Sequence, residues 1–436
     1  MSLTTPEKIR SLQRKLYVKA KAEPSFRFYL LYDKIWRADM LAHAYALARA
    51  NGGAPGVDGV TFAEIEAAGL EEWLARLGEE LRAKSYRPAA VRRVVIPKPG
   101  GGERPLGIPT IRDRVVQGAA KLVLEPIFEA DLEPSAYGYR PGRSAGDAIQ
   151  RVIELLRQDN TEVVDADLSK YFDTIPHREL MASVARRIVD KHVLRLIKLW
   201  LRSPVEETDG NGNRRMVGGK SSTSGTPQGG VVSPMLANLY MNRFLKHWRR
   251  SGRAEAYRAH IISYADDFVI LSRGHAAEAL AWTEQVMARL GLSLNLKKTA
   301  IRDARRERFD FLGYSFGPHC VRQQGRWYLG ASPSQKSVRR LKEKVSAILV
   351  PSNVGAWPEV RDQLIRLLRG WGGYFSHGSH YATDRVLEAH IYDRVRRFLA
   401  RRHKVPTRGT TRFSKQAVFG VLGVPRLRHC RVGATP

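Results

Sequence analysis

The chain has 436 residues, of which 43% are hydrophobic and 9% aromatic, so it is long enough for two or three domains with a sizeable core. Lysine and arginine number 73 against 43 acidic residues, which gives a formal net charge of +30. This excess of positive charge argues against a soluble enzyme that acts on small molecules. It favours a polyanionic partner, with nucleic acid ahead of an anionic membrane.

Cysteine content and hydropathy narrow the class further. Two cysteines, Cys320 and Cys430, cannot form a disulfide framework, and the absence of a CxxC pair excludes a Cys-based zinc finger or zinc nuclease. No apolar stretch reaches the roughly 18 residues that a membrane span needs. The N-terminus is polar and basic, without the apolar region of a secretory signal. We therefore expect a soluble intracellular protein in a reducing compartment, with no membrane contact.

The first 330 residues show a mixed pattern of helices and strands. Residues 111–132 predict a helix, and Asp-Gly-Asn-Gly-Asn at 209–213 predicts a hairpin turn. Short β-rich runs lie at 91–97, 161–168 and 260–272. This order predicts an α+β fold, with a sheet that has helices packed on one face.

The composition changes near residue 330. Gly-Ala-Ser-Pro at 330–333 indicates a short linker, and residues 331–436 hold 21 lysines and arginines but only 6 acidic residues. Helical spacing of apolar residues predicts helices over 334–349, 359–375 and 381–402. Because so little acid balances the charge, we expect this basic helical domain to contact nucleic acid and not merely to present a solvated face.

Two adjacent carboxylates interrupt the apolar run at 260–272. The apolar flanks predict a buried β-hairpin with Asp266 and Asp267 at its tip. Neighbouring carboxylates repel each other unless a cation lies between them, and Mg²⁺ prefers such oxygen ligands. The alternative is a plain Asp-Asp turn.

A second pair of acids ends the strand predicted at 161–168. Asp165 and Asp167 are two residues apart, so on a strand they share a face, and periodicity does not choose between them. A carboxylate at this strand end can meet the hairpin tip of a neighbouring strand. Three converging carboxylates could hold two Mg²⁺ ions about 4 Å apart, the arrangement for nucleotidyl transfer.

Beyond these acids, the chain resembles a known family, the reverse transcriptases encoded within bacterial group II introns, also called intron maturases. The likeness covers most of the chain and is carried, in order, by AYALARANGGAPGVDGVTF, IPKPGGGERPLGIPTIRDRVVQ, YGYRPGRSAGDAI, VDADLSKYFDTIPH, GTPQGGVVSPMLANLYMN, YADDFVIL, GLSLNLKKT, FDFLGYSF and RGWGGYF. It implies a right-hand polymerase fold. Residues 1–330 would form fingers and palm with an N-terminal extension, and residues 331–436 an α-helical thumb or maturase domain.

The resemblance implies the metal site. The first catalytic motif of the family has Asp, four residues, then Phe or Tyr, which fits Asp167 and Phe172. The implied catalytic residues are therefore Asp167, Asp266 and Asp267, and Leu168 is counted with them in the site for two Mg²⁺ ions. Asp165 is then structural or lies behind the metal ligands.

The resemblance also implies nucleotide contacts. Lys98 and Arg104 flank a Gly-rich turn and would grip the triphosphate, while Phe172 would lie under the sugar and exclude a 2′-hydroxyl. Gln228 would lie beside the dNTP, and Lys298 near the leaving pyrophosphate as a candidate general acid. The alternative for Lys98 and Arg104 is an ordinary basic hairpin. For Phe172 it is core packing, and for Lys298 a plain surface charge.

Primer and template contacts follow from two further blocks. The residues concerned are Phe311, Leu312, Gly313 and Trp371. The first three match the block that props the primer end, although a half-buried strand is an equal alternative. Trp371 would line the product duplex or lock the thumb helices together, and the glycines after it weaken any helix there.

The implied function is RNA-directed DNA synthesis by a protein that also binds intron RNA for splicing and mobility. Its partners would be RNA template, intron RNA, DNA primer or target, and dNTPs, in the bacterial cytoplasm, with the oligomeric state open. Without Cys pairs the chain resembles the compact type that lacks the endonuclease. The alternative is a domesticated relative acting in DNA repair or phage defence.

Overall fold

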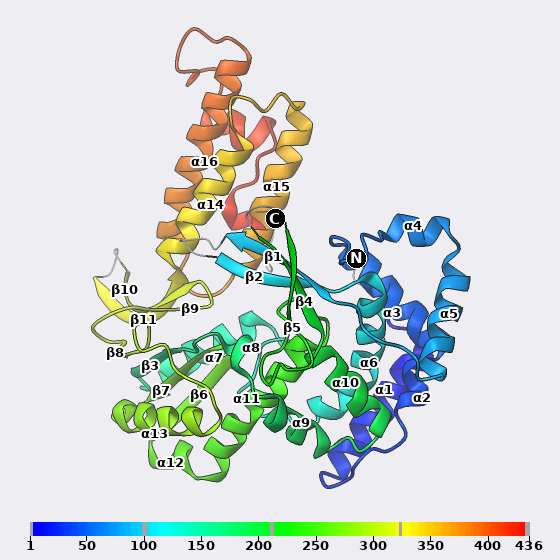
Figure 1. Cartoon of the computed structure of the whole chain (residues 1–436). Coiled ribbons are helices and arrows are strands. Elements are labelled where there is room, and N and C mark those ends of the chain that lie inside the picture. The colour runs from blue at the N-terminus through cyan, green and yellow to red at the C-terminus, as the bar shows by residue number, and fades with distance from the viewer. Residues whose placement is uncertain (1–2, 98–102, 210–212, 322–324, 432–436) are drawn as a thin grey trace.

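The computed structural model describes residues 3–97, 103–209, 213–321 and 325–431. A mixed body of sheets and helices carries a bundle of long helices from the C-terminal part of the chain (Figure 1). This mixture agrees with the α+β class expected from the sequence. Lys98, the Gly-rich turn beside it and the tip of the turn expected at 209–213 lie outside the described residues.

The first three N-terminal helices pack on one central helix, α6 (Ile111–Glu129), while the fifth packs on the third and the fourth on the fifth. In chain order these helices are α1 (Glu7–Ala22), α2 (Tyr32–Ile35), α3 (Ala38–Asn51), α4 (Phe62–Ala67) and α5 (Leu70–Arg82). Helix α6 begins where the Thr110 side chain accepts a hydrogen bond from the Asp113 N–H, and most of its apolar residues are fully buried. The helix expected at 111–132 is therefore present and forms the centre of this region.

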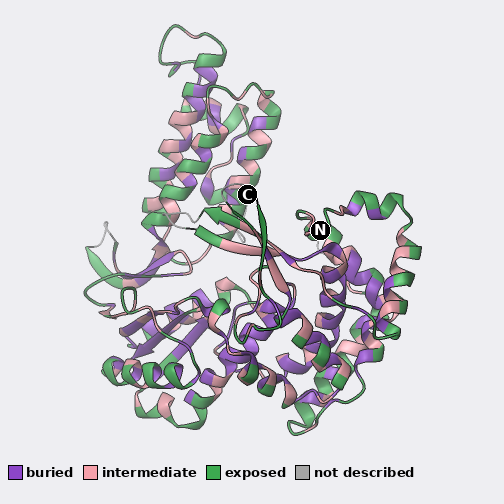
Figure 2. Ribbon diagram, in the orientation of Figure 1, coloured by how far each residue is buried: buried purple, intermediate pink, exposed green. Residues whose placement is uncertain are grey.

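An outer sheet projects over the body. Its strand order is β2-β1-β4-β5, formed by β1 (Val91–Pro97), β2 (Glu103–Ile108), β4 (Pro204–Thr208) and β5 (Arg214–Gly218). Strands β4 and β5 pair antiparallel, as the turn signal between them predicts. The far halves of these strands are exposed, whereas three of the four strands of the central sheet are mostly buried (Figure 2).

The central sheet has the order β6-β7-β3-β8, and its neighbouring strands pair antiparallel. The strands are β3 (Glu162–Asp167), β6 (Ala259–Tyr264), β7 (Asp267–Ser272) and β8 (Ala300–Asp303). The surrounding helices are α7 (Ala145–Arg157), α8 (Tyr171–Thr174), α9 (His177–Ala185), α10 (Lys191–Leu201), α11 (Ser233–Arg250), α12 (Arg253–Ala256) and α13 (Ala276–Arg289).

Helices cover both faces of the central sheet, so the expectation of helices on one face is wrong. Val164 lies in the core shared with α11 and α13, whereas Val163 lies in a second core with α7. Both valines are fully buried because neighbouring strand residues point to opposite faces and both are apolar. Asp165 and Asp167 lie on the face of Val163, and each keeps 28% of its side chain exposed.

The linker expected at 330–333 is instead the end of a strand. A second small sheet has the order β11-β10-β9, from β9 (Phe309–Phe311), β10 (Tyr314–Val321) and β11 (Arg326–Pro333). Gly330 pairs with Gly317 and Pro333 with Tyr314. Small and turn-forming residues suggested a linker, but pairing with β10 holds them in a strand, and Ser334 then caps the next helix.

The C-terminal helices form a bundle with its own core. They are α14 (Gln335–Ile348), α15 (Trp357–Tyr374) and α16 (Tyr381–Arg402), followed by a π-helix, η1 (Ala417–Val421), and a 3₁₀ helix, η2 (Leu427–Cys430). Helix α15 continues through its glycines, contrary to the weakness expected there. A Cβ at Gly372 would lie 2.7 Å from the Cys430 Cβ, so packing of η2 requires glycine at this position.

None of the described helices is both long enough and apolar enough to cross a membrane.

Candidate active site

Strand register brings the acids expected from the sequence to one end of the central sheet. Asp167, the last residue of β3, pairs directly with Asp267, the first residue of β7. Tyr264 pairs with Asp267 across the β6–β7 hairpin, so Ala265 and Asp266 form its two-residue turn. The hairpin with acids at its tip, and its meeting with a neighbouring strand end, are therefore present as the sequence indicated.

The neighbouring backbone fixes the shape of this turn. Ala265 has a φ of +60°, the left-handed region that two-residue hairpin turns require. Gly138 lies against the turn so closely that a Cβ there would be 2.5 Å from the Ala265 nitrogen. The glycine of the YGYR block thus allows the chain to pack directly on the backbone that carries Asp266.

Asp266 and Asp267 resist ionisation. Asp267 is exposed, yet the protein around it desolvates the carboxyl enough that, with the charges of Asp266 and Asp167, its pKa rises to about 6. Desolvation also raises the pKa of Asp266, and Asp167 adds to that rise while Arg104 opposes it. Negative charge is therefore concentrated here beyond what the nearby protein groups neutralise.

One cation, Lys298, already contacts the carboxylate of Asp167. Lys298 Nζ lies 3.0 Å from Asp167 Oδ2, and the Asn295 side-chain amide donates to the same oxygen at 3.2 Å. As the side chains stand, no three acidic, histidine or cysteine groups of the described residues are close enough to hold a metal ion. The donor set nevertheless fits a hard divalent cation, because carboxylate oxygens dominate it and their mutual repulsion favours a bound positive charge.

A cavity of about 850 Å³ opens in front of Asp167 and Asp266, and Asp267 is not part of its lining. Its volume falls within the roughly 300–1,000 Å³ of small-molecule sites, so a nucleotide would fit. The cavity brings together Arg104, Asp167, Leu168, Phe172, Gln228, Asp266 and Lys298. The structure therefore collects on one surface the nucleotide residues that the sequence places on separate blocks, apart from Lys98, which is not described.

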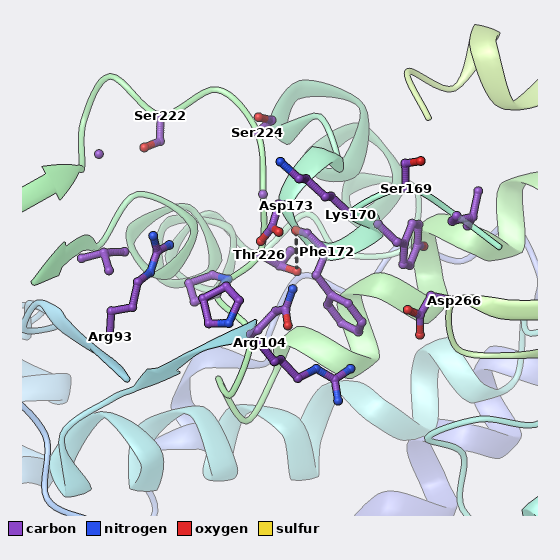
Figure 3. Close-up of a pocket in the computed structure, with 18 of the residues that line it drawn as sticks. Arg93, Arg104, Ser169, Lys170, Phe172, Asp173, Ser222, Ser224, Thr226 and Asp266 are labelled. Atoms are coloured by element: carbon purple, nitrogen blue, oxygen red, sulfur yellow. Dashed lines mark hydrogen bonds between the residues drawn. The ribbon is translucent and has the colours of Figure 1, made fainter. Parts of the chain in front are cut away.

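Phe172 is held at the floor of this cavity. It lies in α8, which starts after Lys170 in the left-handed conformation, and 8% of its surface is exposed. Its carbonyl accepts hydrogen bonds from the Thr226 N–H at 2.7 Å and, more weakly, from the Thr226 hydroxyl at 3.4 Å. The ring points between the Arg104 guanidinium and the Asp266 carboxylate (Figure 3). A side chain fixed in this way can limit the shape of a ligand above it.

Close backbone contact joins the outer sheet to the loop that carries Gln228. The Gly107 N–H donates to the Gln228 carbonyl at 2.5 Å. Gly229 has a φ of +104°, and a Cβ there would lie 2.3 Å from the Gly107 carbonyl oxygen. Glycine at 229 therefore sets Gln228 and strand β2, with its Arg104, against the same cavity.

The residues expected to contact primer and template lie around a separate cavity. It measures about 560 Å³ and is lined in part by Leu312, Gly313 and Trp371. Phe311 is buried in the core behind it. Tyr374 donates a hydrogen bond to the Leu312 carbonyl at 2.8 Å, which ties α15 to the β9–β10 turn. Packing and ligand contact are thus compatible here.

Tyr139 also lies beside the site, although no pattern in the sequence predicted this. Its side chain is 50% exposed, and the surrounding protein, with the Asp266 charge, raises its pKa. A φ of +55° is unusual for tyrosine and holds it beside the hairpin tip. The YGYR block contained the signal, but only the packing of Gly138 on the turn shows where it leads.

Comparisons with known proteins agree with this arrangement. A model of the family "Reverse transcriptase (RNA-dependent DNA polymerase)" matches residues 96–316, just over half of the chain. The chain belongs to the reverse transcriptase family. The "Group II intron, maturase-specific domain" matches residues 338–416, within the C-terminal helices. The protein is thus an RNA-directed DNA polymerase with a group II intron maturase domain on a polymerase fold.

Curated relatives support the same assignment. The chain is 35% identical to Protein YkfC of Escherichia coli over 384 residues, which cover 78% of this chain and 96% of the relative. It is 33% identical to the group II intron-encoded protein LtrA of Lactococcus lactis over 50% of this chain but only 35% of LtrA.

A solved telomerase structure from Candida albicans aligns over 83% of this chain and 64% of its own, with 13% identity and a TM-score of 0.44.

Proposed function

We propose that Asp167, Asp266 and Asp267 bind two Mg²⁺ ions and that the cavity before them binds the incoming dNTP. The observation that carries this proposal is the register that sets Asp167 opposite Asp267, with Asp266 in the adjoining turn. When bound, the ions would activate the primer 3′-hydroxyl and stabilise charge on the leaving pyrophosphate. Leu168, directly after Asp167, completes the lining on that side.

The protein's own groups would bind and orient the triphosphate. Arg104 offers a planar guanidinium that matches phosphate oxygens in pairs, and the undescribed Lys98 would add a second cation. Gln228 would contact the nucleotide from the loop fixed by Gly229. Lys298 is 66% exposed and contacts Asp167, so it would exchange this contact for the leaving pyrophosphate and donate a proton there.

Phe172 would select deoxyribonucleotides. Thr226 holds the Phe172 backbone through its carbonyl, and the ring lies near Arg104 and Asp266. This supports a place beneath the sugar, where the ring would collide with a 2′-hydroxyl. We expect Phe172→Ala to admit ribonucleotides and to lower the preference for dNTPs by about 10-fold or more, the usual scale of a steric sieve. Single-nucleotide incorporation with paired dNTP and rNTP measures this. Unchanged preference in Phe172→Ala would show that the ring only packs.

The C-terminal helices would hold the product duplex and the intron RNA. Leu312, Gly313 and Trp371 line the cavity nearest the palm, where a primer end would lie, and Phe311 would support it from the core behind. Farther along the bundle, a cavity of about 450 Å³ is lined by Arg394, Arg397, Arg401 and Arg402. Such guanidinium clusters bind phosphates without reading sequence. We propose that RNA template, intron RNA, and DNA primer or target all bind this basic chain.

The domain division and the compartment extend the proposal. We propose that residues 1–330 act as fingers and palm, and residues 331–436 as thumb and maturase domain, although β11 crosses this boundary. Both Cys320 and Cys430 are free thiols, which supports a reducing cytoplasm. No match reported above favours a domesticated relative in repair or phage defence.

Primer extension by the full chain with Mg²⁺ and dNTPs tests the proposal. RNA and DNA templates are compared in parallel, with Asp266→Ala/Asp267→Ala as the inactive variant. We expect extension on RNA that this variant loses. Intron splicing is then measured with the same variant, and we expect it to retain splicing help, because RNA binding needs no metal triad. Extension by the double variant at the wild-type rate would contradict the assigned site.

A further inference from the structure

A fourth cavity lies on the N-terminal side of the molecule, away from the acids. It measures about 510 Å³ and is formed by the segment before and within α2, the end of α5 and the start of α10. In Figure 1 these elements lie on the opposite side of the molecule from the C-terminal helices. Its lining includes Tyr29, Leu30, Trp36, Arg82, Lys84 and Lys191. Nothing in the polymerase site uses these residues.

The apolar part of this cavity is presented rigidly. Tyr29 is 61% exposed and Leu30 65% exposed, although both are large and apolar in character. The backbone on either side of them is fixed. The Phe28 N–H donates to the Arg187 carbonyl at 2.7 Å, and the Leu31 N–H donates to Asp190 at 2.9 Å. Tyr29 therefore stands on a preorganised platform and not on a loose loop.

The charge around the platform is positive. Arg82, Lys84 and Lys191 are exposed, and no ion pair involves any of the three among the described residues. The two acids of the lining are already engaged. Asp33 is 3.0 Å from Lys34, and both oxygens of Asp190 accept backbone N–H groups. Lys84 and Lys191 are thus available to an anionic ligand, whereas the Arg82 guanidinium lies over the Trp36 ring, 5.9 Å from its centroid.

Exposed aromatic faces combined with free cations suit one class of ligand. A base stacks on an aromatic ring without regard to sequence, while lysine and arginine neutralise the flanking phosphates. A base pair in a duplex hides its faces, so the ligand must have an unpaired base. We propose that this platform binds a single-stranded segment of nucleic acid, with a base on Tyr29 and phosphates at Lys84 and Lys191.

The proposal rests on the proposed function, because it supplies a second contact for the strand that the protein copies or binds. The platform would hold unpaired nucleotides outside the polymerase cleft. RNA and DNA share this chemistry, and the experiment separates them. An apolar surface for a second copy of the chain is the competing use of Tyr29 and Leu30, and the experiment is designed to detect it.

The test uses the full chain with its cleft filled by a blunt primer–template duplex. A fluorescent 12-residue oligo(U) or oligo(dT) is titrated into this complex, and binding is followed by anisotropy. We expect Tyr29→Ala to weaken strand binding at least about fivefold, the lower end of one base stack, while Tyr29→Phe binds as the wild type does. Tyr17→Ala removes another exposed tyrosine, on α1, and is the matched control.

Salt dependence tests the cations. We expect Lys84→Gln/Lys191→Gln to lower the slope of log affinity against log salt by roughly 1.4, from about 0.7 for each phosphate contact on a single strand. Arg14→Gln/Lys15→Gln, on exposed positions of α1, should leave the slope unchanged. Tighter binding of oligo(U) than of oligo(dT) would assign the platform to RNA, and the reverse order to DNA.

Two outcomes would overturn the inference. One is oligonucleotide binding that is equal in wild type and Tyr29→Ala. The other is a concentration-dependent dimer that Tyr29→Ala dissociates, which would assign the surface to a second copy. Primer extension by the same preparations is measured beside both. If extension proceeds while Tyr29 has no effect, the platform fails and the polymerase assignment stands. If extension fails but the platform binds the oligonucleotide, the platform stands and the polymerase assignment fails.

Discussion

Asp267 and Asp190 show how differently one protein can treat two carboxylates. Burial opposes ionisation of Asp190, yet hydrogen bonds from the backbone N–H groups of Leu31, Tyr32, His192 and Val193 lower its pKa. Asp267 instead faces desolvation and three other acids, so its pKa rises to about 6. The first carboxylate is satisfied by the fold, and the second is left in need of a cation.

The contrast separates a structural acid from a candidate metal ligand. Asp190 begins α10 and ties that helix to the segment at residues 31–32, so its charge holds the fold together. Asp267 lies across from Asp167 at the sheet end, and among the described residues the charge of Lys298 offsets only part of its pKa rise. A carboxylate whose pKa is raised by neighbouring acids beside a cavity is the better candidate for function.

The largest expected effect separates two acids of the same strand face. We expect Asp167→Asn to lower the rate of primer extension by at least about 10³-fold, about 4 kcal/mol in activation free energy, because a metal-binding charge is removed. Asp165→Asn, two residues earlier, should lower it by less than about 10-fold. Single-turnover extension with saturating Mg²⁺ measures both. Equal losses would show that the register does not distinguish the two acids.

The next effect is on stability and concerns Asp190. We expect Asp190→Ala to reduce the free energy of unfolding by about 2–3 kcal/mol, since it removes a helix cap and leaves backbone donors without an acceptor. The rate of extension per folded molecule should not change. Urea denaturation and active-site titration provide the two numbers. If Asp190→Ala is as stable as wild type, Asp190 is not a structural carboxylate.

The smallest effect is a dependence of stability on pH in the absence of metal. Because the pKa of Asp267 in the folded chain is about 6, above the roughly 3.9 of an unfolded aspartate, this group stabilises the fold more as pH falls. Between about pH 4 and 6 its contribution is lost as pH rises. We expect Asp267→Asn to gain about 1 kcal/mol over wild type at pH 7.5, a figure reduced for solvent exposure.

Denaturant unfolding in EDTA across pH 4–8 measures this effect, with the same series in Mg²⁺ as comparison. Mg²⁺ binds the ionised carboxylate, so it should reverse the difference above pH 6. If Asp267→Asn is less stable than wild type in EDTA at pH 7.5, Asp267 is a structural carboxylate like Asp190.

Local pattern predicted much of the site. The apolar runs on either side of Asp266 and Asp267 were enough to predict a hairpin, because alternation and turn chemistry are local properties. The choice between Asp165 and Asp167 was not available from pattern, since both lie on one face. The family motif implies Asp167, and the pairing of Asp167 with Asp267, a contact between residues 100 positions apart, supplies a physical argument for the same choice.

Tertiary packing explains where the sequence misled. Gly330–Pro333 resembles a linker, but pairing with β10 makes it a strand. Gly372 weakens a helix in isolation, yet α15 continues because η2 packs where a side chain would clash. Asp190 carried no motif at all, because its role depends on the N–H groups of Leu31 and Tyr32, which fold against it from a distant segment.

Mg²⁺ binding by the assembled complex tests the central claim most directly. Isothermal titration is carried out on the full chain with RNA template, chain-terminated DNA primer and matching dNTP present. We predict Mg²⁺ binding in wild type and in Asp165→Asn, and its weakening by at least about 10-fold in Asp267→Asn, because the carboxylates supply the ligands. Equal Mg²⁺ affinity in wild type and Asp267→Asn would contradict the assignment of the metal site.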